Sequence, residues 1–264
     1  MTAPEHVAAL LPVRDGERYI GEAIESLLAQ EMDDAANLQI VIVDDASTDA
    51  TAARIDSYED RRITLIRRER STGLADALNA GLACIKAPLV ARLDADDRAA
   101  PDRSQRQREF LVDAPEVAVV GSTARLIDAS GIPVGRRGGE ATPAQIADRL
   151  RSRNALIHPS VMFRTQAVSA VGGYRRAAGR FEDYDLWLRL AATWDLATLP
   201  QALVDYRLHD GQLTTRRVAE RPAIAAVGSS RLALARARGR SVTLARITQA
   251  AWAFHQYRTD RRRT

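Results

Sequence analysis

Two groups of aspartates stand where their side chains could bind a cation. Asp44 and Asp45 end one β-branched run, and Asp94-Ala95-Asp96-Asp97 follows another short apolar run. Carboxylates crowded together repel one another unless a cation or a hydrogen-bond donor holds them. Sites built from oxygen ligands favour Mg²⁺ or Mn²⁺, often together with a nucleotide diphosphate. These residues predict a metal–diphosphate site, and a solvated acidic turn ahead of the next helix is the alternative that they leave open.

The elements around these aspartates alternate between strand and helix. Apolar or β-branched runs predict strands at 7–13, 39–44, 63–66, 89–93 and 117–120. Segments with helical spacing of apolar residues separate them. This alternation is typical of an α/β fold with a parallel sheet and helices on both faces. Because ligands bind at the carboxyl ends of such strands, we expect the two aspartate groups to meet at one edge of the sheet.

The second half of the chain has a looser pattern. Glycines and a proline between Gly121 and Gly139 predict a connection or a mobile loop over one end of the sheet. A helix is expected at 143–152, a strand at 160–163, and a further helix that opens at Glu182. We therefore predict a catalytic domain at 1–215, with a nucleotide-binding half at about 1–121 and an acceptor half at 122–215. Residues 216–264 would form a basic helical C-terminal extension.

Composition places the chain among globular proteins of ordinary solubility. Hydrophobic residues make up 46% and charged residues 27% of the 264 positions, and no stretch has the length and apolarity of a membrane span. The N-terminus lacks the pattern of a secretory signal, so we expect a cytoplasmic location. Cys84 is the single cysteine, which excludes a disulfide within one chain. We expect it to be a small core residue.

Positive charge is concentrated at the C-terminus. Positions 215–264 contain twelve arginines against Glu220 and Asp260, while the chain as a whole carries a formal charge of +4. The basic residues are not interleaved with the aromatic residues on which single-strand binders stack bases, so we expect no nucleic-acid partner. The extension could pack on the catalytic domain, lie on an anionic membrane surface at the inner face of the membrane, or form a homodimer.

Five stretches of the sequence resemble, in order, the family 2 glycosyltransferases of GT-A fold. They are LPVRDGERYIGEAIESLLAQ (11–30), IVIVDDASTDAT (40–51), TGLADALNAGL (72–82), ARLDADD (91–97), and HPSVMFR through EDYDLWLRL (158–190). The resemblance covers about residues 6–210. It implies a Rossmann-like, mostly parallel sheet flanked by helices, and an inverting transfer of sugar from a nucleotide-sugar donor.

The resemblance also implies a set of donor-binding residues. They are Pro12, Val13, Arg14, Asp45, Gly73, Leu74, Asp94 and Ala95. Asp45 matches the carboxylate that recognises the base, with helix capping as its alternative role, and Arg14 stands where an aromatic residue is frequent in the family. Asp94 and Asp96 match the ligands of a Mn²⁺ or Mg²⁺ ion. His209 matches a position that supplies a metal ligand or a phosphate contact in some relatives.

On the acceptor side the resemblance implies a general base. Glu182-Asp183 matches the acidic pair of the family, and Asp183 is its base; the alternative is favourable charge in the first turn of a helix. His158 is a candidate for the sugar pocket or for a core hydrogen bond. Trp187 is a candidate for a sugar platform or for a core residue.

We therefore predict an inverting hexosyltransferase that uses a nucleotide-diphosphate sugar, most simply a UDP-sugar, and a hydroxyl acceptor. The acceptor would be a saccharide, a lipid-linked sugar or another hydroxyl compound in bacterial cell-surface polysaccharide or glycoconjugate synthesis. A nucleotidyltransferase is an alternative, although positions 12–19 lack the glycine- and lysine-rich loop that it usually has. That segment also lacks the G-x-G-x-x-G pattern of nicotinamide oxidoreductases. A non-catalytic nucleotide-sugar-binding protein is the second alternative, and the presence of Asp96 and Asp183 argues against it.

Overall fold

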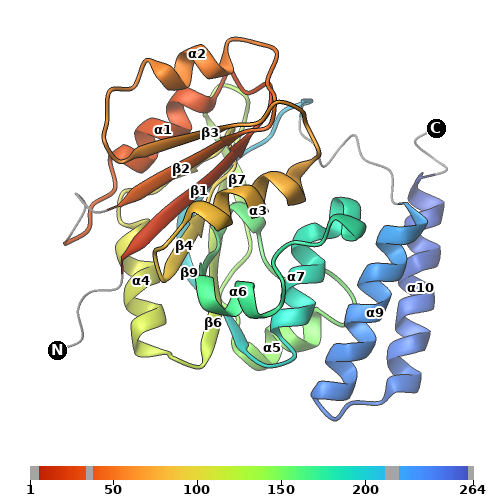
Figure 1. Cartoon of the computed structure of the whole chain (residues 1–264). Helices are drawn as coiled ribbons and strands as arrows, with labels where there is room; N and C mark the ends of the chain where they lie inside the picture. Colours follow the sequence, from red (N-terminus) through yellow and green to blue (C-terminus); the bar gives the residue numbers. More distant parts are fainter. Residues whose placement is uncertain (1–5, 34–37, 212–219, 261–264) are drawn as a thin grey trace.

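The computed structural model describes residues 6–33, 38–211 and 220–260, without the side chains of 257–260. In these residues nine strands form one mixed sheet in the order β3-β2-β1-β4-β8-β6-β9-β5, with β7 paired to β6 (Figure 1). The strands are β1 (Val7–Val13), β2 (Gln39–Asp44), β3 (Ile63–Arg67), β4 (Leu89–Arg92), β5 (Arg98–Ala99), β6 (Val117–Ile127), β7 (Pro133–Arg137), β8 (Met162–Arg164) and β9 (Asp195–Arg207).

Helices cover both faces of this sheet (Figure 1). They are α1 (Ile20–Leu28), α2 (Thr51–Asp56), α3 (Leu74–Cys84), α4 (Arg103–Asp113), α5 (Pro143–Arg149), α6 (Thr165–Ala170), α7 (Glu182–Leu190), α9 (Arg221–Ala237) and α10 (Val242–Asp260), with 3₁₀ turns η2 (His158–Ser160) and η3 (Arg176–Phe181). The predicted α/β architecture with flanking helices is confirmed.

Strands β1 to β4 run parallel to one another. β1 pairs with β2 and with β4, and the register sets Val13 beside Asp44 and Leu10 beside Arg92. Because these strands run in the same direction, their carboxyl ends open on one edge. The two aspartate groups follow two of those ends, as the alternation predicted.

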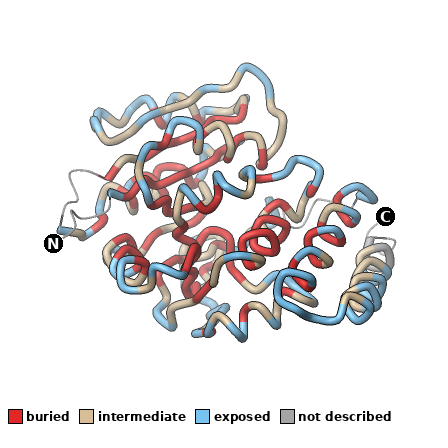
Figure 2. The backbone as a smooth tube through the Cα atoms, turned by 60° about the horizontal axis from the view of Figure 1, so that its bottom comes forward, coloured by how far each residue is buried: buried red, intermediate tan, exposed pale blue. Residues whose placement is uncertain are grey.

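Alternate side chains of the strands fill two hydrophobic cores. Ala8 and Leu10 pack on one face with α3 and α7, while Val7 and Ala9 pack on the other with α1. The central strands are accordingly buried on both sides (Figure 2). Burial of both faces explains why the strands read as continuous apolar runs in the sequence.

The region after Gly121 differs from the expected connection or mobile loop. β6 continues to Ile127, and β7 pairs with it antiparallel, so the glycines and the proline lie in a hairpin. β9 then runs parallel to β6 over most of its length, with register shifts near Thr123. The expectation was wrong because every residue of β7 is exposed, and the strand therefore lacks an apolar pattern.

Cys84 is also placed differently from the expectation. Its side chain is exposed at the last position of α3. The last buried residue of that helix is Gly81, so Cys84 lies beyond the contact between α3 and the sheet. Its apolar neighbours in the sequence were a misleading guide to its burial.

The described part of the C-terminal extension packs on the rest of the chain. α9 contacts α7 and η3, and α10 contacts α9 (Figure 1). Among the described residues, no helix combines the length and apolarity needed to span a bilayer. The boundary predicted at 215/216 lies outside the described residues, and the division into domains stays a prediction, as do the membrane contact and the homodimer.

Candidate active site

An open cleft of about 1230 Å³ lies where β1, β2 and β4 end. Pockets that bind one small molecule usually measure about 300–1,000 Å³, so this cleft has room for two ligands side by side. The loops after β1 and β2 each hold a residue with left-handed backbone, Asp15 (φ 50°) and Ala46 (φ 61°). Such conformations cost free energy in residues other than glycine and are concentrated at functional sites.

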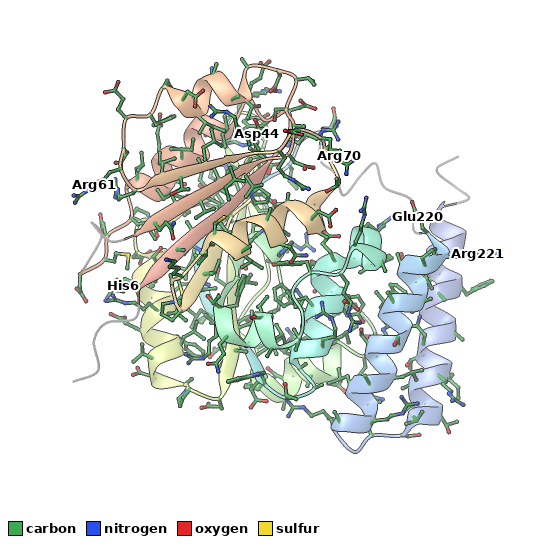
Figure 3. All side chains as sticks on the ribbon, viewed as in Figure 1. His6, Asp44, Arg61, Arg70, Glu220 and Arg221 are labelled. Atoms are coloured by element: carbon green, nitrogen blue, oxygen red, sulfur yellow. The ribbon has the colours of Figure 1, made fainter. Side chains whose placement is uncertain are left out.

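Asp45 organises one end of the cleft. Its carboxylate accepts hydrogen bonds from Arg68 Nη1 at 2.9 Å, Ser71 Oγ at 2.6 Å and the Gly73 backbone N–H at 3.3 Å. Arg14 in turn donates to Ser71 Oγ at 2.8 Å. Figure 3 labels Asp44, the last residue of β2, and Arg70, in the loop between β3 and α3, on this side of the molecule. Asp45 thus fixes the loop 68–73 against the end of β2.

Gly73 lets that loop approach the cleft with a bare backbone. Its φ is 98°, a conformation that residues with a Cβ rarely adopt, and it precedes α3. Gly73 and Leu74 both line the cleft, as do Pro12, Val13 and Arg14 at the end of β1. The backbone at Gly73 and the hydrogen-bonded side chain of Asp45 therefore shape this end of the cleft.

An acidic cluster borders the cleft, in which Asp94 and Asp96 line it and Asp97 is buried beside them. Asp94, Asp96 and Asp97 each offer a carboxylate oxygen, and these atoms lie within 4.8 Å of one another. Asp94 also forms an ion pair with Arg92, the last residue of β4. His209 approaches from the end of β9, with Nε2 at 2.8 Å from Asp96 Oδ2. Strand ends far apart in the sequence thus supply one acidic cluster and one imidazole.

The pKa values and the hydrogen bonding of these carboxylates suit the binding of a divalent cation. Burial, followed by the charges of Asp96 and Asp94, raises the pKa of Asp97 well above its ordinary value. Burial also raises the pKa of Asp94, and the charge of Asp96 adds to this effect although Arg92 opposes it. Within the described residues, Asp97 Oδ2 is buried without a hydrogen-bond partner. A bound cation would relieve both the repulsion and the unsatisfied oxygen.

Arg207 fixes the cluster from behind. Its backbone N–H donates to Asp97 Oδ1 at 2.8 Å, and its Nε donates to the carbonyl of Asp96 at 2.9 Å. Its guanidinium also lies 4.4 Å from the ring centroid of Tyr19, which contacts the His209 ring. Arg207 is 1% exposed, so it supports the acidic cluster from the interior of the protein.

Asp183 lies in the first turn of α7 and lines the same cleft. Its Oδ2 accepts a hydrogen bond from Asn154 Nδ2 at 2.6 Å, and its Oδ1 accepts one from the backbone N–H of Tyr184 at 2.6 Å. The carboxyl keeps some contact with solvent, but protein atoms crowd it, and burial raises its pKa, opposed by these two hydrogen bonds and by Arg92. Glu182, beside it, is buried.

His158 and Trp187 lie behind this part of the cleft wall. His158 Nε2 is 2.9 Å from Tyr174 Oη, and burial, together with the Arg92 charge, lowers its pKa well below the ordinary value. The neutral ring borders the cleft. Trp187 is 0% exposed, packs edge-on against His158, and is not among the residues that line the cleft.

All but one of the sequence-predicted site residues thus lie together. Those that line the cleft are Pro12, Val13, Arg14, Asp45, Gly73, Leu74, Asp94, Ala95, Asp96, His158, Glu182, Asp183 and His209. Sequence reasoning missed Arg92, Asn154 and Trp252, which line it as well. A charged residue inside the apolar run LVAR was a signal for Arg92, whereas nothing in the sequence pattern marked Asn154.

Comparisons with known proteins agree with this arrangement. The sequence model described as glycosyl transferase family 2 matches residues 9–170. The chain is 32% identical over 195 residues to the putative glycosyltransferase EpsE of Bacillus subtilis, covering 72% of this chain and 68% of that protein. It is 28% identical over 213 residues to the O-antigen biosynthesis glycosyltransferase WbnJ of Escherichia coli, covering 77% of this chain and 80% of that one.

Solved structures show the same fold. The S. aureus TarS fragment 1–349 in complex with UDP-GlcNAc matches with a TM-score of 0.71 and 16% identity, covering 94% of this chain and 71% of that one. The mannosyltransferase PcManGT from Pyrobaculum calidifontis, in complex with GDP-Man and Mn²⁺, matches with a TM-score of 0.62 and 20% identity, covering 98% and 83%. At these identities the likeness concerns the fold.

Proposed function

The chain belongs to glycosyl transferase family 2 and has a GT-A-type fold, and on this premise we propose that it transfers a sugar from a nucleotide-diphosphate sugar to an acceptor hydroxyl with inversion at the anomeric carbon. One observation carries the proposal. Asp94 and Asp96, from the end of β4, and Asp183, from the start of α7, line one cleft that is large enough for a donor and an acceptor. Asp94 and Asp96 can therefore act on one ligand, and Asp183 can act on a second.

The donor would lie along the carboxyl ends of β1, β2 and β4. Its base would lie beside Asp45, whose loop is already ordered by Arg68 and Ser71. The ribose would pass Gly73, where the bare backbone leaves room. A UDP-sugar is the simplest donor, supported by the UDP-GlcNAc complex of TarS, while the GDP-Man complex of PcManGT makes GDP-sugars the first alternative to test.

The diphosphate would lie at the acidic cluster. Asp94, Asp96 and His209 would hold a divalent ion there, with Asp97 as a further carboxylate. The Mn²⁺ in the PcManGT complex supports such an ion, and Mg²⁺ prefers the same ligands. When bound, the ion would supply Lewis-acid stabilisation of negative charge on the departing diphosphate.

Asp183 would act as the general base on the acceptor. Its carboxylate takes the proton of the acceptor hydroxyl while that oxygen bonds to the anomeric carbon and the bond from this carbon to the diphosphate oxygen breaks. Attack from the face opposite the leaving group inverts the configuration. Burial of Asp183 raises its pKa and so strengthens it as a base, while the N–H donors of Asn154 and Tyr184 favour its ionised form. General-base assistance is worth roughly 10²- to 10⁴-fold in rate.

The acceptor is proposed to belong to a bacterial cell-surface polysaccharide or glycoconjugate. This rests on relatives such as WbnJ, whose name assigns it to O-antigen biosynthesis. The predicted membrane contact of the C-terminal extension would suit a lipid-linked acceptor, and it remains to be tested with anionic vesicles.

A screen of donors tests the function directly. UDP-, GDP- and dTDP-sugars are added with Mn²⁺, and thermal unfolding is followed, because a ligand at 100 times its Kd stabilises the fold by about 2.7 kcal/mol. The stabilising donor is then used to measure nucleoside diphosphate release by the wild type, by Asp183→Asn and by the control Asp148→Ala. Asp148 is an exposed carboxylate of α5 that pairs with Arg151 and does not line the cleft. If none of the donors stabilises the fold, the proposal is refuted.

A further inference from the structure

The C-terminal helix α10 contributes a side chain to the cleft. Trp252 is partly buried and lines it together with Phe181, Tyr184 and the proposed base Asp183. It lies outside residues 9–170, the part of the chain that the family model matches. The family model therefore gives no expectation for this contact.

Trp252 belongs to a row of aromatic and guanidinium groups. Its ring centroid is 5.0 Å from that of Phe181 at a steep angle, and Arg180 covers Phe181 at 5.2 Å. Arg231 of α9 lies 4.6 Å from the centroid of Trp252 and 5.3 Å from that of Tyr184. The row leads from η3 through α10 and α9 to the residue next to Asp183.

Hydrogen bonds fix Arg231, and with it the indole. Nε and Nη2 donate to Tyr184 Oη at 2.9 and 2.7 Å, and Nη1 donates to Gln249 Oε1 at 2.9 Å. Tyr184 Oη donates to the carbonyl of Leu150 at 2.5 Å. Arg231 is 3% exposed, so its guanidinium is held by these partners rather than by water. An aromatic ring supported in this way is preorganised for a ligand, because little side-chain entropy remains to be lost.

The opposite face of α10 behaves differently. Phe254 and Ile247 are 62% and 61% exposed. Since successive residues of a helix turn by about 100°, Trp252 and Phe254 point to nearly opposite sides. Phe254 thus offers a matched aromatic control on the same helix.

The cleft at Trp252 presents an apolar ring next to hydrogen-bonding groups. Asp183 and Asn154 offer a carboxylate and an amide, and the indole, supported by Arg231 and Phe181, adds apolar ring atoms to the lining. A pyranose has the complementary surface, with hydroxyls at its rim and C–H groups on its faces, and aromatic side chains combine apolar area with such directional contacts.

We propose that Trp252 forms a wall of the acceptor subsite and packs against the C–H face of a pyranose ring in a saccharide acceptor. The inference rests on the proposed function, because the subsite is defined by the hydroxyl that Asp183 deprotonates. α10 is then part of the acceptor site and not only a helix docked on α9.

Saturation-transfer NMR tests this without the natural acceptor. Methyl pyranosides of glucose, galactose, mannose, rhamnose and N-acetylglucosamine are added at millimolar concentration to the full chain with Mn²⁺ and the nucleoside diphosphate selected in the donor screen. At least one glycoside should receive saturation on the protons of one ring face. In Trp252→Ala this signal should fall about 5- to 10-fold, while Trp252→Phe and Phe254→Ala retain most of it.

Nucleotide signals in the same samples separate the possible failures. A wild type that binds no nucleoside diphosphate refutes the proposed function itself. If the nucleotide binds but no pyranoside receives saturation, or if Trp252→Ala keeps the pyranoside signal of the wild type, the acceptor role of Trp252 is refuted. If Trp252→Ala loses the nucleotide signal as well, Trp252→Phe decides. A purely structural role in docking α10 predicts that the pyranoside and nucleotide signals of Trp252→Phe fall in parallel, and this result refutes the acceptor role.

Discussion

Replacing Asn154 by alanine removes the side-chain donor to the proposed base. Asn154 Nδ2 lies 2.6 Å from Asp183 Oδ2, and this hydrogen bond lowers the pKa of a carboxyl that burial otherwise raises. Without it the ionised form loses support, so the pKa of Asp183 rises further. Because a general base acts only when it is deprotonated, the acidic limb of the pH–rate profile should move to higher pH.

The size of this movement follows from the strength of the bond. A hydrogen bond to a charged group contributes about 1.5–3 kcal/mol, and one pKa unit corresponds to about 1.36 kcal/mol, which gives an upper limit of about 1–2 units. Asn154 is exposed, so water replaces part of its contribution. We therefore expect a shift of about 0.5–1 unit, and on the acidic limb a rate about 3- to 10-fold below that of the wild type.

The assay is release of nucleoside diphosphate from the donor, measured from pH 5 to 9 at saturating donor and Mn²⁺. Asn154→Asp serves as a second variant, since a negative charge beside Asp183 should move the limb in the same direction and further. On the alkaline plateau Asn154→Ala should equal the wild type within about 3-fold. A lower plateau with an unshifted limb would show that Asn154 positions a ligand and does not tune Asp183, which refutes the reasoning.

Three further changes test other parts of the molecule. Asp96→Ala should weaken metal-dependent donor binding by at least about 10-fold in calorimetry with Mn²⁺, and an unchanged affinity would contradict its role as a ligand. Asp183→Asn should keep donor affinity within about 3-fold but lower turnover by about 10²- to 10⁴-fold, so turnover near that of the wild type would remove Asp183 as the base. Gly81→Ala should destabilise the fold, because the added Cβ would lie 2.3 Å from Leu10 Cδ1 in a filled core. Overpacking of about 1–3 kcal/mol exceeds the gain of at most about 1 kcal/mol from removing a helical glycine, and a higher urea midpoint would disprove this.

The proposed donor half of the candidate site was predictable from local pattern. Strands buried on both faces give continuous apolar runs, and such runs ended at Asp44 and shortly before Asp94. Parallel pairing then requires those ends to share an edge, so the position of the cleft followed from topology alone. What each carboxylate binds did not follow, because an acidic turn and a metal site have the same sequence.

The half of the sheet built from β6, β7 and β9 was less predictable for a physical reason. β7 is exposed throughout, and β9 changes register against β6, so neither strand has the simple alternation that marks a half-buried strand. Their pairing depends on partners far away in the sequence. Cys84 shows the same limit, since its exposure depends on where α3 leaves the sheet.

Contacts on the proposed acceptor side were the least predictable. Asn154 reaches Asp183 from a loop, and Trp252 reaches the cleft from the C-terminal extension. Leu244, Ile247 and Phe254 of α10 are exposed, so the large apolar residues of this helix do not by themselves mark the face that packs on the protein. Trp252 and Arg231 lie on different helices and meet where α10 packs on α9.

The two sides of the cleft are held by different kinds of contact, and this has a consequence for specificity. Asp45, Asp94 and Asp96 lie within the matched residues 9–170 and are fixed by the register of neighbouring strands. The proposed acceptor side is instead held by contacts between helices, in which Ser230 donates to Asp185 at 2.6 Å and Arg231 donates to Tyr184. Changes in α9 and α10 can therefore reshape the space around the acceptor without disturbing the strand ends that would hold the donor. Selection for a new acceptor would be expected to act first on these two helices.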